Sequence, residues 1–205
     1  MALANSITTG SYVSTLYHYL GFGTKHVIAY GKSRITDALK SNEELLMWKT
    51  LALTDELTGL HNRRSFLLQI EHQISIAKRF KKTLNLVFVD VDNFKQINDT
   101  QGHAAGDQAL IKLAKLLKHS VRGTDVIARI GGDEFCIIIT GDSNAEVQIV
   151  ISRLQNQVHK IRLNEECNFS CSFGVSVFEK DGMNTEELYK AADEAMYKNK
   201  QLKLM

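Results

Sequence analysis

Proline is absent from the 205 residues of this chain, and cysteine occurs only three times. Without proline, no Pro-rich linker divides the chain. The cysteines show no metal-type spacing to nearby histidines, and three of them cannot form a disulfide-stapled scaffold. Cys136 and Cys171 stand in strand-like runs, where a buried thiol is the expected state.

Long apolar runs are missing as well. The uninterrupted apolar stretch Leu86–Val89 is far shorter than the roughly 18 residues that a membrane-spanning helix needs. The start of the given chain shows no basic-then-apolar signal pattern. The apolar fraction of 44% is that of an ordinary soluble domain. We therefore expect a cytoplasmic protein with no membrane partner within this chain.

A strong net charge is also lacking, since 25 Lys and Arg oppose 23 Asp and Glu for a net charge of +2. Residues 1–54 hold five cations and three acids, whereas residues 55–205 hold 20 of each. A neutral main segment argues against a nucleic-acid-binding surface, so we expect no nucleic-acid partner. Any anionic ligand must be held by local cations or by a metal ion.

The chain is predicted to divide into an N-terminal helical segment, residues 1–54, and a main domain, residues 55–205. From about residue 33 to residue 53 the pattern is helical, and Leu39, Leu46 and Leu53 recur every seven residues. Such a narrow apolar seam is typical of two paired helices. We expect this helix to pair two copies of the chain, the alternative being that it packs on the chain's own body.

The main domain shows alternating helix and strand patterns. Helices are predicted at 62–80, 106–119, 144–161 and 185–200, and strands at 84–91, 125–130, 135–140 and 169–177. The two middle strands form a hairpin with a tight glycine turn. This order predicts an α/β fold, an α+β sandwich in which helices cover a partly antiparallel central sheet.

Carboxylates gather where the first buried strand ends. Period-two alternation places Asp90 and Asp92 on one face, with the Val91 carbonyl as a further oxygen ligand. Asp133 and Glu134 follow two glycines at the hairpin turn. If the two strands are neighbours, these acids converge and repel each other unless a divalent cation such as Mg²⁺ is bound.

The acids also admit two other interpretations, a calcium loop and a solvated acidic turn. An EF-hand calcium loop starting at Asp90 is excluded, because Phe94 and Lys95 stand where that loop needs Asp or Asn and then Gly. A solvated acidic turn remains open. Nearby, the amides of 93–95 and the Lys95 ammonium could hold phosphate oxygens. Asn98 and Asp107 could bind a purine edge, although Asp107 also fits an ordinary acid in the first turn of a helix.

Five ordered stretches resemble the GGDEF family of bacterial diguanylate cyclases. They are 55–64 (DELTGLHNRR), 90–103 (DVDNFKQINDTQGH) followed by GD at 106–107, 129–135 (RIGGDEF), 172–175 (SFGV) and 192–200 (ADEAMYKNK). The resemblance covers about residues 55–200. It implies a palm-like fold related to nucleotidyl cyclases, and an enzyme that joins two GTP into cyclic di-GMP with release of two pyrophosphates.

The resemblance also implies roles for individual residues. Two Mg²⁺ ions per active site, which Mn²⁺ could replace, would be bound by Asp90, the Val91 carbonyl, Asp133 and Glu134. Asp133 and Glu134 would be the catalytic residues, with Asp133 the base for the 3′-hydroxyl. The implied substrate-binding residues are Phe94, Lys95, Asn98, His103, Asp107 and Lys200.

The same resemblance implies regulation by the product at Arg122, Asp125 and Arg153, because arginine can stack on guanine and hydrogen-bond it. It further implies a homodimer with GTP as substrate. One departure is that the family's Gly-Arg-Asn after Lys200 is missing: Leu204 takes the arginine's place, and Lys203 could partly substitute. The alternative is a catalytically silent domain that acts as a receptor for GTP or cyclic di-GMP, or as a dimerising adaptor.

Overall fold

The computed structural model describes residues 40–41, 43–141, 145–159, 161 and 169–204. The chain packs as two units, residues 1–50 and residues 51–205. Residues 43–53 are helical, as their sequence pattern predicts. Leu46 of the predicted seam is 56% exposed, and Leu39 lies outside the described residues.

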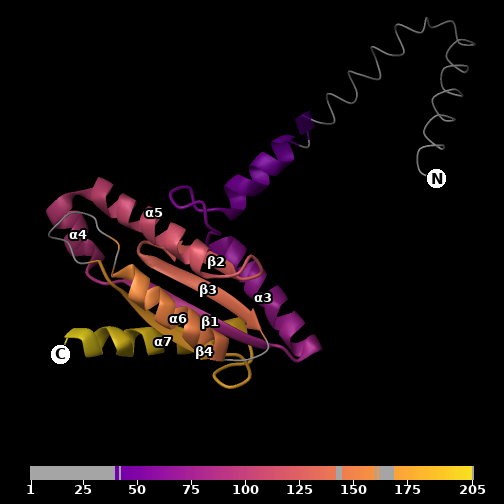
Figure 1. Cartoon of the computed structure of the whole chain (residues 1–205). Coiled ribbons are helices and arrows are strands. Elements are labelled where there is room, and N and C mark those ends of the chain that lie inside the picture. Colours follow the sequence, from indigo (N-terminus) through magenta and orange to yellow (C-terminus); the bar gives the residue numbers. More distant parts are fainter. Residues whose placement is uncertain (1–39, 42, 142–144, 160, 162–168, 205) are drawn as a thin grey trace, which may run out of the picture. The chain divides into compact units, whose positions relative to one another are not determined.

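The second unit is built on a four-stranded sheet with the order β2-β3-β1-β4 (Figure 1). The strands are β1 (Thr83–Val91), β2 (Val126–Gly131), β3 (Glu134–Gly141) and β4 (Cys171–Val177). All three pairings are antiparallel. The predicted hairpin of β2 and β3 is therefore confirmed, and β3 also pairs with β1, the strand that carries Asp90.

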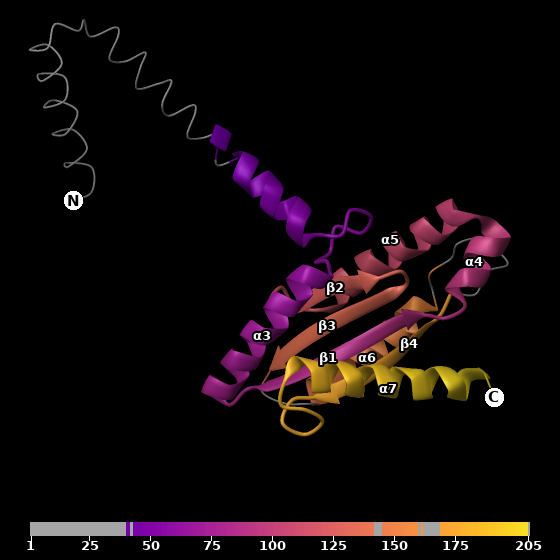
Figure 2. The same ribbon diagram turned by 180° about the vertical axis from the view of Figure 1, so that it is seen from behind.

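Helices cover both faces of this sheet (Figures 1 and 2). On one face, α3 (Arg63–Phe80) and α7 (Thr185–Leu204) pack on Leu86 and Phe88 of β1. On the other, α5 (His103–Ser120) and α6 (Ala145–Val158) pack on Val87 and Val89. Because both faces are covered, β1 reads as a continuous apolar run instead of an alternating one.

One helix was not predicted. Residues Phe94–Gln101 form α4, a segment for which the sequence pattern predicts no element. Only Ile97 of this short polar helix is buried, so it shows little apolar periodicity. The predicted start of α5 is also wrong, since that helix begins at His103 and not at residue 106. Gly102, with φ at 84°, separates α4 from α5.

The ends of the remaining helices differ by a few residues from their predicted limits. α6 ends at Val158 and not at residue 161, and α7 continues past residue 200 to Leu204. Across the described segments, no helix is both long and apolar enough to cross a membrane.

Candidate active site

Two carboxylates face each other at one end of the sheet. Asp90, near the end of β1, is the register partner of Glu134, the first residue of β3. The Val91 N–H donates to the Asp133 carbonyl, with an N···O distance of 3.3 Å, which ties the hairpin turn to the end of β1. The strands are thus neighbours, and all four predicted metal-binding residues lie at one end of the two central strands.

The surroundings of these acids disfavour negative charge. Burial raises the pKa of Asp90, and Asp133 and Asp92 raise it further, which together outweigh the opposing effect of Lys200. Burial also raises the pKa of Glu134, as do Asp133, Asp90 and Asp193. Carboxylates that repel each other in a partly buried site favour a bound cation, so this donor set fits a divalent metal ion.

The cation that the structure places at Asp90 is the ammonium of Lys200, from α7. Burial alone would lower the pKa of Lys200, but the Asp90 carboxylate, aided by Asp92 and Asp133, raises it above its ordinary value. Among the described residues, no three His, Cys, Asp or Glu side chains are grouped closely enough to form a metal centre as they stand. A metal ion bound by Asp90 would therefore compete with Lys200 for that carboxylate.

The polar residues predicted to bind substrate lie on α4 and on the first turns of α5. Asn98 lies directly over Gly106: a Cβ atom built on Gly106 would come within 2.0 Å of the Asn98 Oδ1 atom. The glycine thereby brings Asn98 against the segment that carries His103 and Asp107, both of which are exposed.

The other two substrate-binding predictions on α4 have different surroundings. Phe94 is only partly exposed and packs against the core cluster beneath α5, with its ring also close to Gly106, so the structure gives it a packing role. Lys95, next to it, is exposed.

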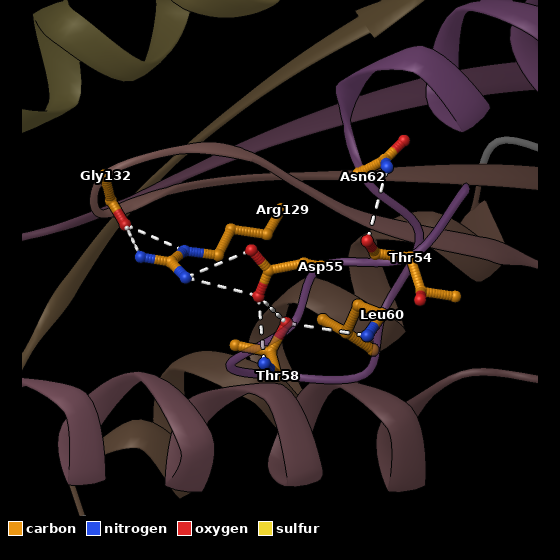
Figure 3. A network of polar contacts seen from close by, with 7 residues as sticks. All are labelled: Thr54, Asp55, Thr58, Leu60, Asn62, Arg129 and Gly132. Atoms are coloured by element: carbon orange, nitrogen blue, oxygen red, sulfur yellow. Dashed lines mark hydrogen bonds and ion pairs between the residues drawn. The ribbon is translucent and has the colours of Figure 1, made fainter. Parts of the chain in front are cut away.

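Arg129 links the hairpin turn to the turn at 55–58 (Figure 3). Its Nε and one terminal nitrogen donate to the Gly132 carbonyl at 2.9 and 2.8 Å. Its other terminal nitrogen donates to both oxygens of Asp55 at 3.2 Å. The backbone carbonyl just before Asp133 is therefore held by a guanidinium that is itself held by a carboxylate.

Asp55 is fixed in turn by its own local hydrogen bonds. The backbone N–H and the hydroxyl of Thr58 donate to it at 2.9 and 2.6 Å. Burial pushes the pKa of Asp55 up, but Thr58 and Arg129 together leave it below the ordinary value. The sequence pattern alone assigns no role to Arg129 or Asp55. The available signal was an arginine two residues before the glycine pair and an acid in a polar turn.

The residues predicted to bind the product are only partly brought together. Arg122 and Asp125 close a tight turn, in which the Arg122 N–H donates to the Asp125 carboxylate at 2.8 Å. Both line a cavity of about 290 Å³, together with Lys118 and His61. Arg153 does not line it; it donates instead to the backbone carbonyl of Ser120.

The sequence and the fold of this chain have counterparts among known proteins. Residues 52–204 match the family model described as "Diguanylate cyclase, GGDEF domain". Diguanylate cyclase DgcS from Shewanella oneidensis is 34% identical over 149 residues, which make up 73% of this chain and 50% of that protein. Response regulator PleD from Caulobacter vibrioides is 35% identical over 174 residues, or 82% and 38% of the two chains.

Among solved structures, the coiled coil and GGDEF domain of DgcB from Caulobacter crescentus, in complex with c-di-GMP, superimposes with a TM-score of 0.78. It is 25% identical and covers 85% of this chain and 94% of that one. The predicted α/β fold is confirmed by this likeness, and the chain belongs to the GGDEF-domain diguanylate cyclase family. It spans half or less of the length of these curated relatives.

Proposed function

We propose that this domain is a Mg²⁺-dependent diguanylate cyclase that condenses two GTP into cyclic di-GMP. The observation that carries the proposal is the register pairing of Asp90 with Glu134, with Asp133 in the adjoining turn. Three acids at one end of the two central strands form a donor set for phosphate-bridging metal ions. The family membership of residues 52–204 supports the same activity.

The reaction consists of two equivalent phosphoryl transfers. The 3′-oxygen of one GTP attacks the α-phosphorus of the other, a new P–O bond forms, and the α–β anhydride bond breaks to release pyrophosphate. Asp133 takes the proton of the 3′-hydroxyl. Magnesium, when held by Asp90, the Val91 carbonyl, Asp133 and Glu134, would acidify that hydroxyl and neutralise charge on the phosphates.

Substrate recognition is assigned to α4, α5 and α7. Asn98 and Asp107 would bind the guanine edge, which offers both donors and acceptors, with His103 close to the nucleotide. Lys95 and Lys200 would contact phosphate oxygens. Lys200 would exchange its present partner, Asp90, for the substrate, and a metal ion held by Asp90 would neutralise that carboxylate instead.

Two copies of the domain are needed, because each site supplies one GTP and the product joins two head to tail. Two-fold symmetry lets each 3′-hydroxyl meet the other nucleotide's α-phosphorus. The helix at residues 43–53 carries exposed Leu45, Leu46 and Leu51, which are 51, 56 and 48% exposed. These apolar side chains support pairing with the same helix of a second copy, which would raise the effective concentration of the domains.

Feedback by cyclic di-GMP is proposed at Arg122 and Asp125, with Arg153 as a third contact. Support comes from the cavity of about 290 Å³ that Arg122 and Asp125 line and from the cationic Lys118 at its wall. For Arg153 to take part, it would have to leave the Ser120 carbonyl.

Incubation of the purified protein with GTP and Mg²⁺, followed by ion-exchange chromatography, tests the proposal. The expected products are cyclic di-GMP and pyrophosphate in a ratio of one to two, with none from Asp90→Asn. A protein that binds GTP and leaves it intact would instead be the silent receptor. The same assay with EDTA establishes whether the metal ion is required.

A further inference from the structure

The end of α7 is attached to the end of β1 at two successive points. Lys200 and Lys203 are three residues apart and share one face of the helix. Lys200 pairs with Asp90, and the Lys203 ammonium lies 2.9 Å from the Asp92 carboxylate. Asp90 and Asp92 are two residues apart and share one face of the strand. The Lys200–Asp90 and Lys203–Asp92 ion pairs therefore lie side by side between α7 and the end of β1.

The Lys203–Asp92 ion pair is held by more hydrogen bonds than the Lys200–Asp90 pair. Asp92 also accepts hydrogen bonds from the hydroxyls of Ser170 at 2.7 Å and Ser172 at 2.6 Å. Its backbone N–H donates to the Ser170 carbonyl at 3.0 Å, and its side chain is only 10% exposed. Burial opposes the charge of Asp92, but Lys203 and the two serines hold its pKa below the ordinary value.

Lys203 makes a second contact that joins three elements. Its ammonium donates to the Cys171 carbonyl at 2.6 Å as well as to Asp92, so it connects the last turn of α7 with the end of β1 and the start of β4. The last turn of a helix lacks internal partners for its final carbonyls and opens readily. An anchor at this turn therefore decides how well Lys200, one turn earlier, is held in place.

We propose that Lys203 is a positioning residue of the cyclase site: through Asp92 and the Cys171 carbonyl it holds the end of α7, so that Lys200 stays within reach of the phosphates after it has exchanged Asp90 for the substrate. This inference rests on the proposed function, which assigns Lys200 to phosphate and Asp90 to metal. Lys203 itself acts without touching the substrate, because its ammonium is engaged by Asp92 and the Cys171 carbonyl.

Steady-state kinetics of Lys203→Ala test this role. Loss of a partly exposed ion pair lowers the population of the ordered helix end, so the KM for GTP should rise roughly fivefold while kcat is kept. Lys203→Arg should restore the KM, because it keeps a charged donor. Adding Asp92→Asn to Lys203→Ala should cost no more than the larger single effect. Lys198→Ala, an exposed lysine of the same helix, is the matched control and should leave the KM unchanged.

Amide hydrogen exchange gives a readout that needs no turnover. Exchange over residues 197–204 should be roughly fivefold faster in Lys203→Ala than in the parent, and unchanged in Lys198→Ala. If the parent makes no cyclic di-GMP, the proposed function fails, and the exchange data still decide whether Lys203 is an anchor. Unchanged exchange in Lys203→Ala overturns the proposal. So does a fall in kcat at constant KM that Lys203→Arg leaves uncorrected.

Discussion

Asp90 and Glu134 stand directly opposite each other on the two central, antiparallel strands, so two carboxylates share one face of the sheet where these strands end. Like charges in this arrangement oppose folding. The pKa values of both groups are raised by burial and by the neighbouring acids. The arrangement costs stability, which Lys200 offsets in part at Asp90 and which a bound metal ion would offset further.

Glu134→Gln should stabilise the metal-free domain at about pH 7 by up to about 1 kcal/mol, because it removes one of two opposed charges. A carboxyl whose pKa is raised on folding costs stability above its unfolded pKa, so the gain should shrink as the pH falls to about 4. Thermal unfolding in EDTA at both pH values checks this. Added Mg²⁺ should stabilise the parent more than the variant.

The matched control for this substitution is Glu71→Gln, an exposed acid on α3. It should respond to Mg²⁺ as the parent does. An equal gain from Mg²⁺ in the parent and in Glu134→Gln would remove Glu134 from the metal site.

Arg129→Ala should destabilise the domain by about 1–3 kcal/mol, because the partly buried Asp55 carboxylate and the exposed Gly132 carbonyl lose their shared donor. Arg129→Lys should recover only part of this, since an ammonium cannot reproduce the paired contacts of the guanidinium. Urea unfolding measures both. Arg64→Ala, an exposed arginine on α3, should stay within about 0.5 kcal/mol of the parent. A loss for Arg129→Ala no larger than that control would mean that the contacts contribute nothing.

Gly106→Ala should cost about 1–3 kcal/mol and weaken GTP binding, because its new methyl group would overlap the Asn98 amide oxygen. Asn98→Ala in the same chain should relieve much of the stability loss, since it removes the overlapping atoms. Gly123→Ala is the control, as nothing lies within 4 Å of a Cβ atom there. Chemical unfolding and GTP titration distinguish these variants. Strictly additive stability losses in the double variant would show that overlap with Asn98 is not what excludes a side chain at position 106.

Arg122→Ala should relieve inhibition by cyclic di-GMP while leaving the initial rate of the reaction unchanged, because it alters the proposed product site and no proposed catalytic group. Progress curves with and without added cyclic di-GMP measure the effect. Lys112→Ala on α5 provides a comparison outside the cavity lining. Inhibition of equal strength in Arg122→Ala and the parent would leave the 122–125 segment as a surface turn only.

Specific activity should rise with protein concentration, because the two half-sites must meet. Replacing both Leu39 and Leu46 by glutamine should lower activity at a given concentration by weakening helix pairing. Activity across a dilution series, measured alongside light scattering, checks this. Constant specific activity from a monomeric species would assign the helix another role.

Local patterns in the sequence were sufficient to predict most of the elements. The continuous apolar run before Asp90 predicts a strand covered on both sides, and the double glycine predicts the hairpin turn; both are present. Helix α3 is similarly clear, because its apolar residues recur with helical spacing and Asn62 caps its start. Such signals are readable because they depend on neighbours within a few residues.

Short polar α4 shows the limit of that reasoning. It carries a single buried residue and is held by packing against α5 at Gly106, which a periodicity count does not register. Tertiary packing, and not local propensity, decides such a segment.

Pairings between distant residues depended on the tertiary structure alone. The sequence determined that acids stand at the end of β1 and at the hairpin turn. Only the antiparallel register of the folded sheet made Asp90 and Glu134 opposite partners. Likewise, Lys203 and Asp92 are 111 positions apart, and Arg129 and Asp55 are 74 apart. A hydrogen bond or ion pair forms only when its two groups come within a few ångströms of each other. The sequence pattern does not determine such distances between distant residues, because they are set when the sheet and the helices pack.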